Sequence, residues 1–380
     1  MVGGAPSLTI GIEEEYLLVD AETRALAADP PKEMYERCAA KLGEQVAHEF
    51  LKSQIEVNTR VARSIPEATQ MLAELRGTVI DIAAEFDLLP IAASTHPFSH
   101  WSEQGFTEQE RYTTIANDLQ AVVRRLVICG MHVHVGIEDD ELRIDLMNQV
   151  RYFLPHLLAL TTSSPFWQSE NTGLKSYRLS VWDEMPRTGI PNAFDSYAEY
   201  ERHVAALVNA GIIEDATKLW WDIRPSARFP TLEMRICDVC THIHDAASVA
   251  ALYCCIIRML WRLKTKNQRW RQYAVMLISE NRWRAQRYGL DEGLVDFGRG
   301  EIVPFAELVD ELIDLVNEDA EALGCTDELM NLKKIIEKGT SAHRQVRRYD
   351  EILGTGKNND QALIAVVDQL AAETRDFSKI

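Results

Sequence analysis

Residues 8–20 read LTIGIEEEYLLVD, a stretch with the composition of a buried strand that is interrupted by three consecutive glutamates. β-Branched and aromatic residues favour extended, half-buried structure. Alternate residues of a strand share a face, so Glu13 and Glu15 lie on one face and Glu14 lies among the apolar residues of the other. Burying an unpaired carboxylate is strongly unfavourable. The pattern therefore requires something that offsets these charges.

Three later segments alternate in the same way: 54–58 (QIEVN), 131–135 (MHVHV) and 232–236 (LEMRI). Each has an apolar face and a polar face. The polar residues are Gln54, Glu56, Asn58, His132, His134, Glu233 and Arg235. A half-solvated antiparallel sheet explains any single strand of this kind. Four strands whose polar faces are rich in Glu and His instead favour one shared site.

Several carboxylates on one face repel each other and take up protons unless a cation offsets their charge. Carboxylate oxygens are hard ligands, which favours Mg²⁺ or Mn²⁺. Mg²⁺ sites commonly include substrate phosphates, and arginine suits bidentate phosphate contacts. Four arginines fall in or beside the irregular and strand segments: Arg178, Arg224, Arg228 and Arg235. This pattern predicts a site for a metal and a phosphorylated ligand.

A zinc site is the alternative interpretation. His132 and His134 form an H-x-H pair on one strand face, which can bind zinc together with a glutamate. This would make the protein a metal-dependent hydrolase. A second H-x-H pair, His242 and His244, lies where a strand gives way to a helix, and we expect it to have a structural or surface role. The chain has no P-loop, no nucleophile elbow and no Rossmann glycine motif.

The remaining pattern predicts a mixed body followed by helices. Helices are predicted over 64–87, with Ser64 as its cap, over 107–129 and over 140–163. The segment 163–194 is rich in Pro, Gly and Ser and is expected to be a functional loop. From residue 243 the chain looks almost wholly helical, and the apolar stretch 246–261 is predicted to be a buried helix too short to span a membrane. We expect one catalytic domain over 1–380, with an α+β body over about 1–242 and a helical portion over about 243–380.

Composition narrows the class of protein further. The formal net charge of −18 over 380 residues argues against nucleic acid or anionic membrane as a partner. Seven cysteines are few for this length and odd in number, which fits a reducing compartment. No secretory signal is visible in the first residues. We expect a cytoplasmic protein.

Five motifs, in this order, resemble the YbdK-type carboxylate–amine ligases, the bacterial glutamate–cysteine ligase type 2 family. They are GIEEE (11–15), STHPF (94–98), GMHVHVG (130–136), WWDIRPS (220–226) and LEMRICD (232–238). The resemblance covers about residues 8–360. It implies a glutamine-synthetase-like α+β fold, in which a curved, mostly antiparallel sheet has helices on one side and a helical C-terminal region. The acidic face would line a funnel, and Glu14, on the opposite face, would be structural.

The resemblance also implies an ATP-dependent ligase that forms an amide through an acyl phosphate, with glutamate and cysteine as possible, weakly used substrates. Its cofactors would be ATP and Mg²⁺ or Mn²⁺. The implied metal ligands are Glu13, Glu15, Glu49, Glu56, His132 and Glu233. Glu233 and Arg235 would act in catalysis, and Arg178, Arg224 and Arg235 would bind ATP. His134 keeps no assigned role.

Two rival functions stay open beside the ligase. One is the metal-dependent hydrolase that uses His132, His134 and glutamates. The other is a guanidino-kinase-like phosphotransferase, because the same fold hosts such enzymes. The expected partners are a small-molecule acid and a small-molecule amine, and a homo-oligomer such as a homodimer is expected.

Overall fold

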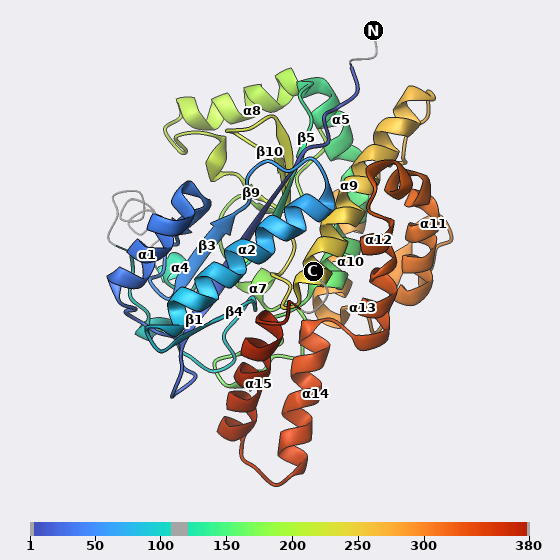
Figure 1. Ribbon diagram of the computed structural model, residues 1–380. Helices are drawn as coiled ribbons and strands as arrows, with labels where there is room; N and C mark the ends of the chain where they lie inside the picture. The colour runs from blue at the N-terminus through green and yellow to red at the C-terminus, as the bar shows by residue number, and fades with distance from the viewer. Residues whose placement is uncertain (1–3, 108–120, 378–380) are drawn as a thin grey trace.

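The structure, a computed structural model, describes residues 4–107 and 121–377 (Figure 1). Its centre is a seven-stranded sheet with the order β10-β11-β5-β1-β3-β2, and β4 also pairs with β1. All pairings in this sheet are antiparallel, as predicted. The strands are β1 (Ile10–Asp20), β2 (Val46–His48), β3 (Gln54–Asn58), β4 (Leu88–Ile91), β5 (Met131–Gly136), β10 (Ile223–Pro225) and β11 (Thr231–Met234).

Helices cover the apolar face of this sheet. In Figure 1, α2 (Ile65–Ala84) crosses in front of the strands and α9 (Ile243–Thr265) lies beside it. The Ser64 hydroxyl accepts a hydrogen bond from the backbone N–H of Glu67 at 3.3 Å, which confirms the predicted cap. α9 has 23 residues and is long and apolar enough to cross a membrane, so the prediction that it is too short is wrong. Since 78% of its apolar window is buried, α9 is a core helix, as expected.

Glu14 lies on the helix-covered face and has its own cation. Its Oε2 accepts a hydrogen bond from Arg76 Nη2 of α2 at 2.6 Å, and both residues are almost fully buried. Tyr16 donates a further hydrogen bond to Glu14 at 2.5 Å. Arg76 also donates to the carbonyls of Thr241 at 2.7 Å and Cys240 at 3.1 Å. The charge that the sequence placed in the core is therefore paired and hydrogen-bonded, which is the condition for burying it.

Further helices surround this body and form most of the C-terminal third. They are α1 (Lys32–Leu42), α4 (Ala121–Arg124), α5 (Asp140–Val150), α6 (Leu154–Thr161), α7 (Arg178–Trp182), α8 (Tyr197–Asn209), α10 (Val275–Tyr288), α11 (Phe305–Leu323), α12 (Thr326–Met330), α13 (Leu332–Lys338), α14 (Ser341–Gly354) and α15 (Asn359–Thr374). The helix predicted over 107–129 falls mainly on residues 108–120, which lie outside the described residues.

The C-terminal region is almost wholly helical, as predicted, with one exception. β12 (Leu294–Asp296) and β13 (Glu301–Val303) form a hairpin between α10 and α11. Its strands have three residues each, too few for alternation to be recognised. The turn between them contains Gly300 at a φ of +73°, a conformation that glycine adopts readily.

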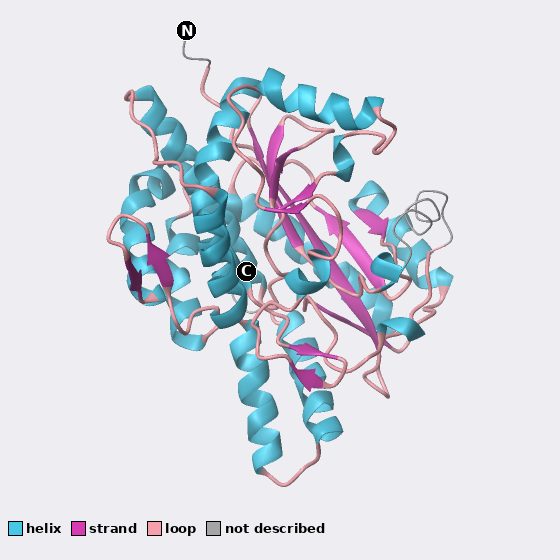
Figure 2. Ribbon diagram, turned by 180° about the vertical axis from the view of Figure 1, so that it is seen from behind, coloured by secondary structure: helices cyan, strands magenta, loops and turns pink. Residues whose placement is uncertain are grey.

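Loops cross the other face of the sheet, as the view from behind shows (Figure 2). The predicted irregular segment 163–194 contains only short elements: β6 (Phe166–Trp167), β7 (Glu170–Asn171), α7 and β8 (Thr188–Gly189), and β8 pairs with β9 (Trp220–Trp221). The polar face of the sheet thus becomes the floor of a cavity with walls made by loops.

Candidate active site

The strand register brings the alternating polar residues together. Residues directly opposite each other on neighbouring strands share a face and lie close enough to interact. The opposed pairs are Glu13 with His132, Glu15 with Glu56, Glu233 with His134, and Arg224 with Glu233. Five strands, β1, β3, β5, β10 and β11, therefore contribute to one polar surface.

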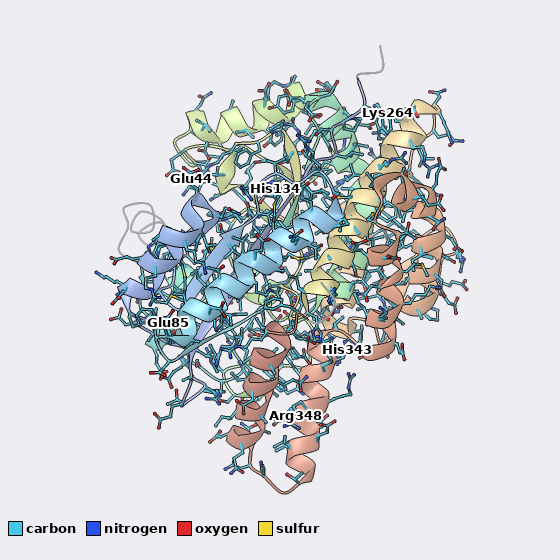
Figure 3. All side chains as sticks on the ribbon, viewed as in Figure 1. Glu44, Glu85, His134, Lys264, His343 and Arg348 are labelled. Carbon is cyan, nitrogen blue, oxygen red and sulfur yellow. The ribbon has the colours of Figure 1, made fainter. Side chains whose placement is uncertain are left out.

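A cavity of about 280 Å³ lies over this surface. Every residue predicted for the site lines it: Glu13, Glu15, Glu49, Glu56, His132, Arg178, Arg224, Glu233 and Arg235. His134 and Arg228 line it as well, with Phe50, Trp182, Trp220 and Phe229 as aromatic walls. Figure 3 labels His134 in the upper part of the molecule, away from His343 and Arg348 on the C-terminal helices.

One set of possible metal-binding atoms comes from Glu13, His134 and Glu233, which we call the paired group. Glu13 contacts two imidazoles: its Oε1 lies 3.1 Å from His134 Nε2, and its Oε2 lies 2.9 Å from His132 Nδ1. Burial acts to raise the pKa of Glu13, but these hydrogen bonds outweigh it and hold the pKa well below its usual range.

Glu233, the most buried member of the paired group, has two arginine partners. Arg224 Nε donates to it at 2.8 Å and Arg224 Nη2 at 3.2 Å, and Arg235 Nη1 donates to its Oε1. Burial raises the pKa of Glu233, but the charges of Arg235 and Arg224 dominate and lower it strongly. The paired group is therefore charge-compensated by the protein itself.

A second set comes from Glu15, Glu49 and Glu56, which we call the unpaired group. Within the described residues, no Lys, Arg or His forms an ion pair with any of the three. Gly130 N–H donates to Glu15 Oε2 at 2.7 Å. Burial and then the charge of Glu56 raise the pKa of Glu15 to about 7. Burial and the neighbouring carboxylates also raise the pKa of Glu49 and Glu56.

The unpaired group fits a hard divalent cation. It offers oxygen ligands from three side chains whose atoms lie within 4.8 Å of one another. A bound cation would supply the positive charge that the protein does not provide here, and oxygen donors suit Mg²⁺ or Mn²⁺ better than zinc.

The arginines differ in the donors that they leave for a ligand. Arg235 is nearly buried, and its Nε has no hydrogen-bond partner among the described residues. Among the described residues, the Arg178 guanidinium donates to the carbonyls of Ile236 at 3.2 Å and of Arg235 at 3.3 Å. Arg224, in contrast, uses its remaining Nη1 on two backbone carbonyls at 2.9 Å each. Arg235 and Arg178 are thus freer than Arg224 to contact phosphate.

The two histidines of the 131–135 strand occupy different positions. The predicted metal ligand, His132, lies outside both sets, and burial with the charge of Arg235 lowers its pKa to about 4. His134, which had no assigned role, lies opposite Glu233 and joins the paired group. Both residues share a strand face, so only the register, which the sequence does not reveal, distinguishes them.

Sequence reasoning missed a buried network of hydrogen bonds next to the segment that carries Arg235. Arg282 of α10 donates to Asp222 at 2.7 Å and to Asp183 at 2.7 Å. The Asp222 carbonyl accepts hydrogen bonds from the backbone N–H groups of Arg235 at 2.8 Å and of Ile236 at 3.1 Å. Asp222 lies within the WWDIRPS motif, which was the available signal.

The fold of this chain is that of known ATP-dependent ligases. A glutamate–cysteine ligase from Francisella tularensis, solved in complex with AMP, aligns with a TM-score of 0.68 at 13% identity, over 97% of this chain and 89% of that one. A bifunctional glutathione synthetase from Pasteurella multocida aligns with a TM-score of 0.69 at 15% identity. That match covers 96% of this chain but about half (52%) of the bifunctional protein.

Sequence comparison then gives the family. The model of glutamate-cysteine ligase family 2 matches residues 9–369, so the chain belongs to that family. A protein of Rhodospirillum rubrum named "Putative glutamate–cysteine ligase 2" is 61% identical over 97% of this chain and 96% of its own length. A protein of the same name from Jannaschia sp. is 54% identical over 95% of both chains.

The chain is therefore an ATP-dependent carboxylate–amine ligase with a glutamine-synthetase-like fold, as the motifs implied. The comparisons give no support to a metal-dependent hydrolase or to a guanidino-kinase-like phosphotransferase.

Proposed function

We propose that this enzyme activates the carboxylate of an amino acid with ATP and Mg²⁺ or Mn²⁺, and that glutamate and cysteine are the first acid and amine to test. One observation carries the proposal: in the described part of the chain, a single cavity is lined by three carboxylates that form no ion pair, beside Arg178 and Arg235, and the Nε of Arg235 has no hydrogen-bond partner there. The names of the relatives support the choice of substrates.

The two carboxylate sets are the proposed places for divalent cations. The unpaired group would hold one cation, and the paired group would offer Glu13, His134 and Glu233 to another. His132 would then orient Glu13 through its hydrogen bond at 2.9 Å. When bound, such cations neutralise phosphate charge and align the phosphoryl group for transfer.

In the proposed reaction, a substrate carboxylate oxygen attacks the γ-phosphorus of ATP and ADP leaves, which gives an acyl phosphate. The amine nitrogen then attacks the acyl carbon, and inorganic phosphate leaves as the amide forms. Arg235 and Arg178 would donate hydrogen bonds to the oxygens of the transferring phosphoryl group, where charge develops. Glu233 would hold Arg235 in place through their ion pair.

This reaction needs no covalent intermediate on the protein, which agrees with the absence of a nucleophile motif from the sequence. The apolar walls around Trp182 and Phe229 would exclude water, which could otherwise hydrolyse the acyl phosphate.

The test is ADP and phosphate release from Mg²⁺-ATP, measured with glutamate alone, cysteine alone and both, followed by mass detection of the dipeptide. Release that needs both substrates supports the proposal. Glu233→Gln should lose this activity, whereas Glu307→Gln, at an exposed site on α11, should keep it. If neither glutamate nor a panel of other amino acids stimulates ADP release, the proposed substrate class is wrong.

We also propose that residues 1–380 act as one catalytic domain, that the enzyme assembles as a homodimer, and that it works in the cytoplasm. All seven cysteines are free and buried, which supports a reducing compartment. Analytical ultracentrifugation of the full chain tests the assembly.

A further inference from the structure

Asp238 lies four residues after β11 and is fully buried, and among the described residues no cation lies within ion-pair distance of it, although the charge of Arg178 acts on it from farther away. Three donors hold its carboxylate instead. The Ser163 N–H and the Ser164 hydroxyl donate to Oδ2, and the Ser176 hydroxyl donates to Oδ1, each at 2.8 Å. Such a complete set of donors fixes the position of a buried carboxylate.

These three serines mark the two ends of one loop. The Ser164 hydroxyl, which donates to Asp238, accepts a hydrogen bond from the backbone N–H of Arg178 at 3.1 Å. The Ser164 carbonyl accepts another from Tyr177 N–H at 2.9 Å. Asp238 therefore closes the loop 163–178 immediately before Arg178, the first residue of α7.

The Arg178 side chain enters a narrow slot. A Cβ on Gly130 would lie only 2.4 Å from Arg178 Nη2, so any larger residue at position 130 would force the guanidinium to shift. On another side, the guanidinium carbon lies 5.9 Å from the centre of the Trp182 ring. Gly130 N–H in turn donates to Glu15, so this slot adjoins the unpaired group. A small displacement of the loop would remove Arg178 from the slot.

We propose that Asp238 is a positioning residue, which acts through Ser164 and Ser176 to hold the Arg178 guanidinium at the phosphate-binding side of the cavity. Asp238 does not line the cavity and so does not contact the substrates itself. This inference rests on the proposed role of Arg178 toward ATP.

The test compares the affinity of the full-length protein for a non-hydrolysable ATP analogue with Mg²⁺, together with KM for ATP and kcat. We expect Asp238→Asn to weaken analogue binding and to raise KM for ATP by about tenfold, the size expected when one charge-assisted hydrogen bond is lost. Ser164→Ala, which also releases the Arg178 N–H, should act in the same direction and serves if Asp238→Asn does not fold.

A double-mutant cycle separates positioning from a general structural role. Once Arg178 is replaced by Ala, Asp238→Asn should change analogue affinity less than twofold, because its target is gone. Thr241→Val is the matched control: Thr241 is buried in the same segment, donates to the Ala92 carbonyl at 2.7 Å and has no link to Arg178. It should lower Tm and leave analogue affinity unchanged.

Two failures are distinguishable. If Arg178→Ala leaves analogue affinity unchanged, the proposed role of Arg178 fails, and the inference fails with it. If Arg178→Ala weakens binding but Asp238→Asn does not, or if the two effects are additive, the inference about Asp238 alone is overturned. Restoration of analogue affinity by Ser176→Thr relative to Ser176→Ala, since threonine keeps the hydroxyl, would support the positioning role.

Discussion

The paired group and the unpaired group share one cavity and one sheet, but they differ in how their charge is balanced. The protein surrounds Glu13 and Glu233 with imidazoles and arginines, and the pKa of both carboxyls is lowered. It gives Glu15, Glu49 and Glu56 no ion-pair partner within the described residues, and the pKa of each is raised. Two sets of similar residues thus differ in one respect. The protein balances the charge of the paired group by itself, and it does not balance the charge of the unpaired group.

This difference indicates a division of tasks within the cavity. Charges that the protein pairs for itself have a fixed geometry before any ligand arrives, which suits the orientation of an arginine. Charges that remain unpaired favour a cation, because binding relieves their mutual repulsion. We therefore expect the unpaired group to contribute most to metal affinity and the paired group to contribute most to the placement of Arg235.

The largest expected effect is on turnover when the unpaired group loses one charge. Glu56→Gln keeps the size of the side chain but removes a proposed metal ligand, so kcat/KM for ATP should fall by ~10²–10⁴, about 3–5 kcal/mol of transition-state stabilisation. Steady-state ADP release measures it, with Glu307→Gln as the surface control. An activity within tenfold of the parent enzyme would contradict the assignment of Glu56.

The second effect is thermal stabilisation by Mg²⁺. A ligand that binds only the folded state at 100 times its Kd contributes about 2.7 kcal/mol, which should raise Tm by a few degrees. Glu49→Gln should lose most of this shift, whereas Glu233→Gln should keep most of it. Scanning calorimetry across a Mg²⁺ titration checks both, and the reverse order would show that the comparison is wrong.

The third effect concerns the free energy of unfolding of the metal-free protein, which the two groups should change in opposite directions. Glu233→Gln leaves Arg224 and Arg235 without their carboxylate and should destabilise the fold by about 1–3 kcal/mol. Glu15→Gln removes a charge directly opposite Glu56, and relief of this repulsion should stabilise the fold by up to about 1 kcal/mol. Urea unfolding in the presence of a chelator gives both values. Equal destabilisation by the two variants would remove the distinction.

The smallest effect is the pH dependence of stability that comes from His156. It sets the pH range in which the stabilities above can be compared. Burial lowers the pKa of His156 to about 4, so the unfolded chain binds a proton below pH 6.5 that the folded protein does not. The contribution of His156 to the free energy of unfolding is fully present above pH 6.5 and declines as the pH falls toward 4. The decline is about 1 kcal/mol between pH 6.5 and 5.5. His156→Phe should reduce this slope in urea unfolding at several pH values. An unchanged slope would assign it to other groups.

The sequence predicted the faces of the strands well, because alternation is a local property. It separated Glu13 and Glu15 from Glu14, and it placed both histidines of β5 on the polar face. Every site residue that it named lines the cavity, but it assigned no role to His134. The family resemblance, rather than the strand pattern, implied Glu49, which precedes the strand that carries Glu56.

The sequence could not predict contacts that depend on register or on distant pairing. Whether His132 or His134 meets Glu233 is decided by how β5 pairs with β11, a long-range property. The hydrogen bonds that Arg224 donates to Glu233 and to backbone carbonyls likewise depend on how the strands pair. The hydrogen bonds from Arg282 to Asp183 and Asp222 join segments that are 60 or more residues apart in the sequence. No local sequence pattern can predict them.

The buried pair of Glu14 and Arg76 has a consequence for how this sequence can vary among its relatives. Replacing either residue alone would leave a charge in the core without a partner, which typically destabilises a protein by about 3–5 kcal/mol. Replacing both with apolar residues of similar volume would avoid that penalty. Positions 14 and 76 should therefore be conserved together or replaced together. The cavity residues on either side of Glu14, Glu13 and Glu15, should be conserved because of the reaction alone.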